Sequence, residues 1–259
     1  MQAAIVTVGD ELLAGDTENT NATWLCRELT ERGVSVQRVL TVPDGVETIA
    51  DVVGEYARAF DAVIVTGGLG GTPDDLTMEG VAGAFDRSLA VDAIAKADLE
   101  RTLAAIADDY PDLNVDVDAE ASIPEGARPL VNSAGLSPGC VVEPREGTDG
   151  DHGRVYVLPG IPTEMQPMFE SVADEFDGDT ESRTLYTDEP EAALIERLDE
   201  VRHRFGVQVG CYPDRAVRHN RLVLRSDDVA TLEEAHAWLG ENVRTVGPPS
   251  DGAAEESSD

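Results

Sequence analysis

The sequence predicts an α/β domain with a mostly parallel sheet, followed by a smaller α+β domain. Short apolar runs at 2–8 and 62–66 are typical of strands buried on both faces. Segments with apolar residues at helical spacing alternate with these strands, and such alternation implies parallel strands joined by right-handed crossovers. Beyond residue 180 the order changes to strand, helix, two strands and helix, which favours a separate α+β unit.

The first elements follow from local patterns. Trp24, Leu25 and Leu29 recur at helical spacing, and Gly33 stands where glycine commonly ends a helix. Residues 34–42 alternate as a strand before the turn Pro43-Asp44-Gly45. We expect next a helix carrying Ile49, Val53 and Phe60, the strand 62–66, a helix to about Phe85 and an Ala-rich helix over 92–109.

The rest of the first domain is predicted from its breakers and short apolar runs. Residues 124–139 are rich in Pro and Gly and indicate a loop. Short strands near Cys140–Glu143 and Arg154–Leu158 flank a polar loop, so we expect a hairpin joined to the sheet. Pro162 suits the first turn of a helix that continues to about Phe176.

Composition divides the chain into three predicted parts. The α/β domain covers residues 1–176, and a short linker leads to the α+β domain at 180–246. The elements expected there are strand 183–187, helix 190–204, strands near 206–212 and 220–226, and helix 229–244. Residues 247–259 are rich in Pro, Ser, Gly and acids, which predicts a disordered acidic tail.

Charge excludes some classes of partner. The 259 residues include 52 Asp and Glu but 19 Lys and Arg, a net charge of −33. This charge repels nucleic acid and anionic membranes, so neither is an expected partner. Lys96 is the only lysine, and many acids with almost no lysine suggest a halophilic protein from a high-salt cytosol, where repulsion is screened. The alternative is an ordinary acidic protein.

Cysteine usage and the start of the chain favour a cytoplasmic location. Cys26, Cys140 and Cys211 lie far apart and form no disulfide framework. Residues 1–8 lack a basic segment and resemble a first strand rather than a signal peptide. No apolar run is long enough to span a membrane.

Three strands end in turns of unusual composition. These turns are Gly9-Asp10-Glu11, the glycine-rich segment 67–75, and residues 159–164. Ligands of parallel sheets bind at the carboxyl ends of the strands, where glycines let backbone N–H groups approach a phosphate. Carboxylates at the same edge could hold a divalent metal that binds phosphate oxygens. The sequence therefore predicts a metal-plus-phosphate or nucleotide site at this edge.

Other chemistries lack their motifs. The glycine run has no Gly-Lys-Ser/Thr and does not have the dinucleotide-binding spacing. Ser133 and Ser137 have no His–Asp partners arranged around them, which disfavours a serine hydrolase. The scattered histidines show no metal-ligand spacing and are interpreted as surface or structural residues, His219 being the best exception: His152, His203, His219 and His236. A glycine turn is often only a tight turn, and acids are frequent here, so the prediction depends on three turns sharing one edge.

Five segments carry a resemblance to a known family. They are Val8-Gly-Asp-Glu-Leu-Leu13, Asn19-Thr-Asn21, the glycine-rich segment 66–77, Asn132-Ser-Ala-Gly-Leu-Ser-Pro-Gly139 and Leu158-Pro-Gly-Ile-Pro-Thr-Glu-Met165. Together they resemble the molybdopterin-binding (MoaB/Mog) superfamily, and most closely the N-terminal part of the competence/damage-inducible protein A (CinA) group. They occur in family order over 1–175, and residues 180–245 resemble the small domain that follows in that group.

The resemblance implies a three-layer α/β/α fold that binds a phosphorylated pterin or an adenine nucleotide. Asp75 and Asp44 match the acids that handle metal and phosphate, and so become candidate catalytic and metal-binding residues. Gly67, Gly68, Gly70 and Thr72 would cradle phosphate. The other residues expected to line the site are Gly9, Asp10, Glu11, Asn21, Pro159, Gly160 and Glu164. The resemblance also suggests a homo-oligomer.

Three activities fit this resemblance. The first is hydrolysis of a nucleotide diphosphate such as ADP-ribose with Mg, Mn or Co. The second is a role in molybdenum cofactor biosynthesis, by binding or adenylylating molybdopterin. The third is a module that binds a nucleotide or pterin without turnover. The acidic turn Gly9-Asp10-Glu11 replaces the serine-rich turn of the molybdenum-cofactor enzymes, and Gly71 replaces a usual proline. The chain ends too early for a nicotinamide-mononucleotide deamidase domain, so that activity is not implied.

Overall fold

The computed structural model describes residues 1–144, 153–214 and 219–248. The chain divides into two units, Met1–Gly178 and Asp179–Asp259, and each is described by itself. Residues 249–259, nearly all of the tail for which disorder is predicted, lie outside the described part of the chain. His152 lies outside it as well.

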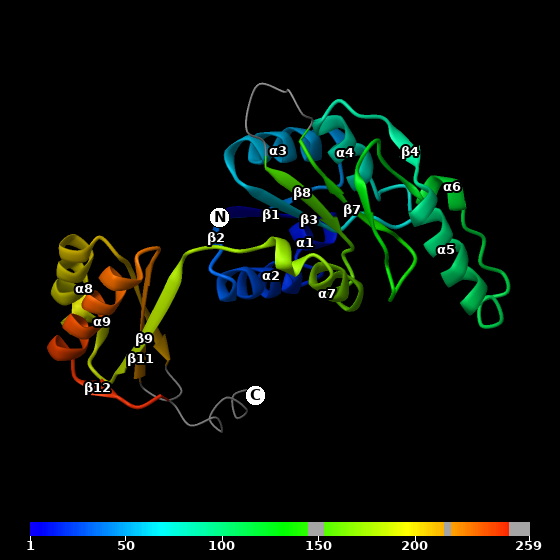
Figure 1. Ribbon diagram of the computed structural model, residues 1–259. Helices are drawn as coiled ribbons and strands as arrows, with labels where there is room; N and C mark the ends of the chain where they lie inside the picture. The colour runs from blue at the N-terminus through cyan, green and yellow to red at the C-terminus, as the bar shows by residue number, and fades with distance from the viewer. Residues whose placement is uncertain (145–152, 215–218, 249–259) are drawn as a thin grey trace. The chain divides into compact units, whose positions relative to one another are not determined.

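A six-stranded sheet forms the centre of the first unit (Figure 1). Its strands, in spatial order, are β2 (Ser35–Val42), β1 (Gln2–Val8), β3 (Ala62–Thr66), β8 (Arg154–Leu158), β7 (Gly139–Val142) and β6 (Arg128–Leu130). The first four are parallel, whereas β7 and β6 are antiparallel to their neighbours. The predictions of a mostly parallel sheet and of a β7–β8 pair joined to it are therefore confirmed.

Helices cover both faces of this sheet, because β1 and β3 are apolar on both sides. On one face, Ile5 and Ile64 pack with residues of α2 (Thr20–Glu31) and α7 (Pro162–Glu170). On the other face, Val6 and Val65 pack with residues of α3 (Val46–Ala59) and α4 (Thr77–Ala84). This arrangement confirms the three-layer α/β/α fold.

Several short elements differ from the sequence prediction. The segment expected to be a loop over 124–139 contains β6, whose pairing with β7 is a contact that local composition does not reveal. The turn after β1 begins a short helix, α1 (Asp10–Ala14). The helix α5 ends at Ile106, and α7 ends at Glu170 before a 3-10 turn. The remaining unpredicted elements are β4 (Leu89–Val91), β5 (Ser122–Pro124) and α6 (Val117–Glu120).

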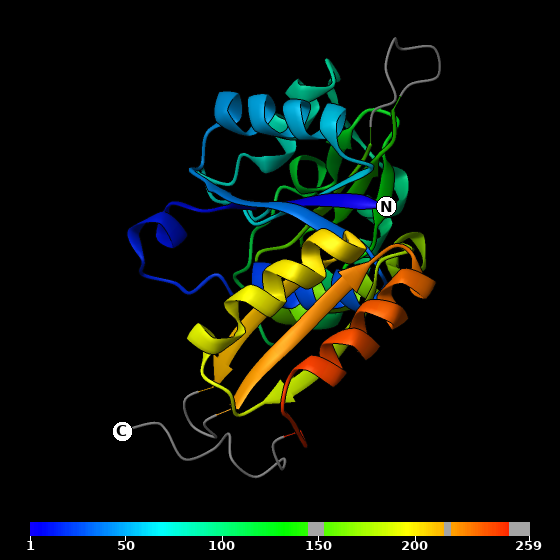
Figure 2. The same ribbon diagram turned by 90° about the vertical axis from the view of Figure 1, so that its left-hand side faces the viewer.

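The second unit is a four-stranded antiparallel sheet with two helices on one face (Figure 2). The strand order is β10 (Gln208–Asp214), β11 (His219–Ser226), β9 (Glu181–Thr187) and β12 (Thr245–Val246). The helices α8 (Glu191–Phe205) and α9 (Val229–Asn242) bury Leu194 and Leu239 against the sheet. This confirms a small C-terminal unit with antiparallel strands, to which the structure adds β12.

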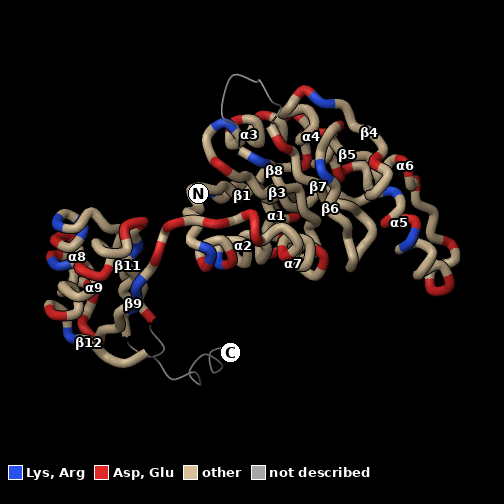
Figure 3. The backbone as a smooth tube through the Cα atoms, viewed as in Figure 1, with Lys and Arg blue, Asp and Glu red and all other residues tan. Residues whose placement is uncertain are grey.

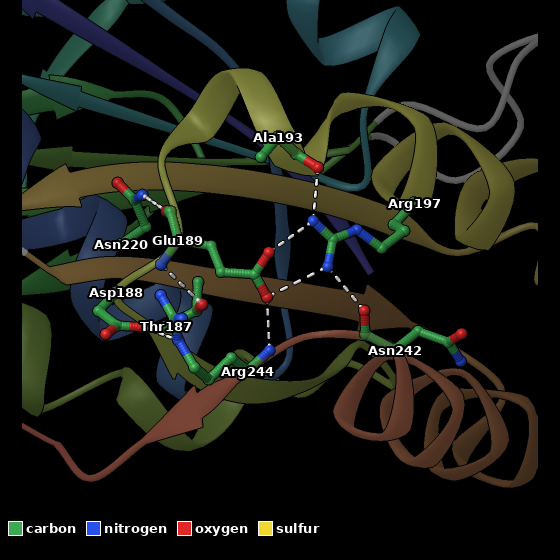
Figure 4. A network of polar contacts seen from close by, with 8 residues as sticks. All are labelled: Thr187, Asp188, Glu189, Ala193, Arg197, Asn220, Asn242 and Arg244. Atoms are coloured by element: carbon green, nitrogen blue, oxygen red, sulfur yellow. Dashed lines mark hydrogen bonds and ion pairs between the residues drawn. The ribbon is translucent and has the colours of Figure 1, made fainter.

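A polar network fastens the elements of the second unit together (Figure 4). The Glu189 carboxylate accepts hydrogen bonds from Arg197 at 2.7 and 3.1 Å and from the backbone N–H of Arg244. Arg197 also donates to the Asn242 carbonyl at the end of α9. The Arg197 guanidinium, followed by the Arg244 N–H, lowers the pKa of Glu189 to about 2. The network thus joins α8, α9 and β12 to the residues after β9.

Acidic residues dominate both units. Figure 3 shows Asp and Glu along helices and loops, with Lys and Arg at far fewer positions. Several cations pair with nearby acids, as in Lys96–Asp118 at 2.6 Å. None of the helices in the described part of the chain is long and apolar enough to cross a bilayer.

Candidate ligand site at the carboxyl edge of the sheet

The carboxyl ends of β1, β3 and β8 lie side by side. The parallel register pairs Thr7 with Thr66 and Thr66 with Leu158, so the three following turns leave the sheet at one edge. The N–H of Gly67 donates to the Leu158 carbonyl at 3.2 Å, and the N–H of Gly9 donates to the Val42 carbonyl at 3.1 Å. The structure therefore brings together the turns that the sequence singled out.

Glycine is required where these turns meet. Gly67 has a φ of +105°, and a Cβ there would lie 2.2 Å from the Val8 carbonyl oxygen. A Cβ at Gly160 would lie 3.2 Å from the Cα of Gly67. Because the backbones after β1, β3 and β8 pack directly on one another, side chains at these positions would separate the turns.

Asn21, in the first turn of α2, links two of the turns. Its Nδ2 donates to the Gly160 carbonyl at 2.6 Å and to the Thr66 hydroxyl at 3.3 Å. That hydroxyl donates in turn to the Pro159 carbonyl at 2.6 Å. Asn21 Oδ1 is buried and has no hydrogen-bond partner among the described residues.

Asp44 lies among other carboxylates. It follows β2, and its carboxylate accepts a hydrogen bond from the Asp10 N–H at 2.8 Å. Burial raises the pKa of Asp44, and the nearby charges of Asp10, Glu11 and Asp74 raise it further, against the lowering effect of that hydrogen bond. This concentration of negative charge would be relieved by a cation.

Asp75 shapes its own loop. Its carboxylate accepts hydrogen bonds from the Thr72 N–H at 3.0 Å and from the Thr72 hydroxyl. The Thr72 hydroxyl also lowers the pKa of the neighbouring Asp74. A Cβ at Gly70 would lie 2.6 Å from Asp75 Oδ2, so the carboxylate packs against the glycine run. Asp75 therefore has a local partner as well as a place beside the predicted phosphate loop.

Gly71 accommodates a further acidic side chain, that of Glu120. A Cβ at this position would lie 2.4 Å from Oε1 of Glu120, which belongs to α6. Burial, followed by the charge of Asp75, raises the pKa of Glu120. Gly71, which stands where the resembling proteins usually have proline, thus leaves space for the Glu120 carboxylate, which adds negative charge next to Asp75.

Thr77 is the site residue that sequence reasoning missed. It is the first residue of α4, is fully buried, and donates its N–H to the Gly68 carbonyl at 3.1 Å. A Cβ at Gly68 would lie 2.5 Å from Thr77 Oγ1 and 3.5 Å from Asp44 Oδ1. Thr77 Oγ1 has no hydrogen-bond partner among the described residues. The available signal was its position as the threonine that closes the glycine-rich motif.

Glu164, in the first turn of α7, contacts the loop between β6 and β7. Its carboxylate accepts a hydrogen bond from Asn132 Nδ2 at 2.7 Å. Asn132 is buried, and its Nδ2 also donates to the Ser137 carbonyl at 2.9 Å. The backbone N–H of Asn132 donates to the Asp98 carboxylate at 3.0 Å. Glu164 therefore fastens the loop between β6 and β7 to α7, and Asn132 is the residue on which this connection depends.

The remaining candidates take less central places. Gly9 precedes α1, where Asp10 and Glu11 are exposed in the first helical turn. Cys140 is fully buried, and burial raises the pKa of its thiol to about 12, which confirms its interpretation as a core residue. His219 begins β11 in the second unit.

The acidic residues fit an open metal site better than a closed one. Within the described residues, no group of three or more His, Cys, Asp or Glu side chains is arranged to hold a metal ion. Mg²⁺ is commonly bound by one or two carboxylates together with substrate phosphates and waters, so a preformed protein cage is not required. Asp44, with Asp10 beside it, fits that mode.

Comparison with known families decides the membership of the chain. Residues 4–177 match the model of a family described as "probable molybdopterin binding domain". The chain belongs to this family. Residues 179–246 match a second model, described as "FAD synthase, middle domain". The two matched segments correspond to the two units of the structure.

Individual relatives support the same placement. A protein of Pyrococcus furiosus is 36% identical over 247 residues, covering 92% of this chain and 96% of the relative. A "CinA-like protein" of Gemmatimonas aurantiaca is 41% identical over 212 residues, and the match covers 78% of this chain but 47% of the relative. The crystal structure of CinA from Thermoplasma acidophilum, titled as having unknown function, is 33% identical with a TM-score of 0.57, covering 68% of this chain and 99% of that one. The resemblance to the MoaB/Mog superfamily and to CinA is confirmed.

Proposed function

We propose that the first unit binds a nucleotide diphosphate such as ADP-ribose and hydrolyses its pyrophosphate bond with the help of a divalent metal. The observation that carries this proposal is the arrangement around Gly68. A buried hydroxyl, Thr77 Oγ1 at the start of α4, and a carboxylate with a raised pKa, Asp44, both lie beside Gly68 in the turn that follows β3. A phosphate bridging a hydroxyl donor and a carboxylate-bound cation suits this arrangement.

The residues of the chain have separate roles in this reaction. The Thr77 hydroxyl and the backbone N–H groups of the glycine-rich turn bind phosphate oxygens, aided by the N-terminus of α4. Asp44 and Asp75, with Asp10 and Glu11 near Asp44, would hold the metal, and Asp75 also orders the loop through Thr72. A bound Mg²⁺, Mn²⁺ or Co²⁺ would supply charge neutralisation and a more acidic water. Attack of water on phosphorus then cleaves ADP-ribose to AMP and ribose 5-phosphate.

A second candidate is molybdopterin binding in molybdenum cofactor biosynthesis. The description of the family favours this candidate. A pterin phosphate would use the same glycine turns and the same Thr77 hydroxyl. The acidic first turn, with Asp10 and Glu11 in α1, favours a metal-bound diphosphate instead. A third candidate, binding without turnover, needs the turns but not the acids.

One panel separates these functions. The protein is incubated in multimolar KCl with ADP-ribose, FAD, NAD or ATP, each with Mg²⁺, Mn²⁺ or Co²⁺, and release of AMP or phosphate is measured. We expect metal-dependent AMP release from ADP-ribose, and its loss in Asp44→Asn. Binding of ADP-ribose without release in any arm would support a non-catalytic module. Binding of molybdopterin with no affinity for ADP-ribose would favour the cofactor pathway.

We also propose that the protein works in a high-salt cytoplasm as a homo-oligomer. The net charge of −33 with a single lysine supports the high-salt assignment, because concentrated salt screens repulsion within and between chains. Light scattering after size exclusion in multimolar KCl tests the oligomer, and a monomeric mass would contradict it.

A further inference from the structure

The Asn21 amide has a fixed orientation. The Gly160 carbonyl can only accept a hydrogen bond, so the group 2.6 Å away must be the Asn21 NH₂. The Thr66 hydroxyl gives its proton to the Pro159 carbonyl and therefore also needs a donor from Asn21. Because rotating the amide would break both contacts, Oδ1 is held as an acceptor on the opposite side.

The neighbouring Asn19 shows that this pattern is not a general feature of the start of α2. Its Nδ2 donates to the hydroxyls of Thr7 at 2.9 Å and Thr41 at 3.3 Å, and its Oδ1 accepts from the Ala22 N–H at 3.1 Å. Both ends of the Asn19 amide are thus satisfied by the protein. For Asn21, two residues along, the described part of the chain satisfies only the donor end.

Two buried oxygens without a partner among the described residues adjoin the same turn, residues 66–68, one from α2 and one from α4. Asn21 Oδ1 belongs to a side chain that contacts Thr66, and Thr77 Oγ1 lies against Gly68. Buried polar atoms are rarely left without a hydrogen bond, because losing one costs free energy. Both atoms adjoin the end of β3, where a bound water or a ligand would supply the missing partners.

The chemistry of the two oxygens differs. A hydroxyl such as Thr77 Oγ1 can donate to a phosphate oxygen, whereas an amide oxygen can only accept. Phosphate oxygens are ionised near neutral pH and have no proton to give. The group that reaches Asn21 is therefore either a bound cation or a part of the ligand that carries an O–H or N–H, and EDTA removes the cation. In a nucleotide diphosphate the donors nearest to the phosphates are the sugar hydroxyls.

We infer that Asn21 Oδ1 accepts a hydrogen bond from a ribose hydroxyl next to the diphosphate and makes the site selective for ribose over deoxyribose. This inference rests on the proposed function, since it takes the phosphates to lie in the glycine turns. Asn21 then acts as a specificity residue, while Thr66 and Gly160 hold its amide in the orientation that recognition requires.

Matched pairs of ligands test the inference without turnover. Dissociation constants are measured in EDTA for ADP against 2′-deoxy-ADP and 3′-deoxy-ADP, and for ribose 5-phosphate against 2-deoxyribose 5-phosphate. These pairs cover the sugars on both sides of the diphosphate. The proteins are wild type, Asn21→Ala and, as a matched control, Asn19→Ala. We compare the ratio of the two dissociation constants within each pair, because general damage to the site weakens both ligands alike and leaves this ratio unchanged.

We expect the wild type to prefer the ribose form of at least one pair by about tenfold, the usual effect of one neutral hydrogen bond. The preference should vanish in Asn21→Ala and remain in Asn19→Ala. Equal affinity of the wild type for both members of every pair would overturn the inference, as would a preference that survives Asn21→Ala. A preference for ADP over IDP that is lost in Asn21→Ala but kept in Asn19→Ala would also overturn the ribose assignment, because it would show that Asn21 contacts an N–H of the base. A wild type that binds neither ADP nor ADP-ribose, in EDTA or with Mg²⁺, Mn²⁺ or Co²⁺ added, would overturn the proposed function itself.

Discussion

The Thr77 hydroxyl separates a ligand-binding role from a structural one. Replacement by valine keeps the shape of the side chain and removes a buried hydroxyl that has no partner among the described residues. We expect Thr77→Val to be as stable as wild type, or more stable by about 1 kcal/mol, and to bind nucleotide about tenfold more weakly. Thermal unfolding and isothermal titration measure the two effects.

Thr66→Val is the matched control for that substitution. The Thr66 hydroxyl is fully used, donating to Pro159 and accepting from Asn21, so its loss should lower the melting temperature. A Thr77→Val protein that is destabilised as much as Thr66→Val would show that the Thr77 hydroxyl is structural.

Asp75 is expected to matter more for activity than for stability. Asn at this position can still accept the Thr72 N–H, so we expect Asp75→Asn to unfold within about 1 kcal/mol of wild type. The lost charge should sharply weaken metal-dependent nucleotide binding and turnover, measured by titration and AMP release in high salt. Asp74→Asn is the control, and equal or greater damage in that variant would show that the role carried over to Asp75 is wrong.

At the scale of elements, the turns depend on glycine to different degrees. At Gly67 a Cβ would meet the Val8 carbonyl oxygen at 2.2 Å, whereas at Gly15, also at positive φ, nothing lies within 4 Å. We expect Gly67→Ala to cost more than about 2 kcal/mol of folding free energy and Gly15→Ala about 1 kcal/mol. Urea unfolding of both variants gives the comparison, and equal costs would mean that the contact between turns adds nothing.

The Glu189 network predicts an acid-sensitive second unit. The pKa of Glu189 is lowered from 4.5 to about 2, so its ionised form stabilises the fold fully above about pH 4.5. That stabilisation should be lost as the pH falls from 4.5 towards 2. Wild type should therefore melt above Glu189→Gln at neutral pH, and the difference should shrink across this interval.

Glu233→Gln is the control for this pH dependence. Glu233 pairs with Arg183 on the surface, and half of its side chain is exposed, so the pair contributes little. A Glu189→Gln protein with the melting profile of Glu233→Gln at every pH would contradict the role of the network.

At the scale of the whole molecule, charge predicts a requirement for salt. In about 0.01 M salt the screening length reaches about 30 Å, so the acids repel one another across the molecule. Figure 3 shows few cations to offset them. We expect dialysis from multimolar KCl into dilute buffer to unfold the protein, as followed by circular dichroism. An unchanged melting temperature at about 0.05 M salt would contradict the halophilic assignment.

The sequence by itself determined the features that arise from local pattern. Apolar runs such as 62–66 define buried strands, helical spacing defines α2 and α3, and glycine and proline mark the turns that follow β1, β3 and β8. Because parallel strands share their carboxyl ends, this information was enough to predict three turns at one edge.

Only the tertiary structure decided which side chains lie together at that edge. Strand β6 forms because residues 128–130 pair with β7, and the Glu164 carboxylate accepts a hydrogen bond from Asn132. Neither contact can be predicted from the local spacing of residues. The unpartnered oxygens of Asn21 and Thr77 are likewise visible only when every neighbour has its place. The physical reason is that hydrogen-bond satisfaction depends on groups far apart in the chain, whereas strand and helix patterns depend on groups close together.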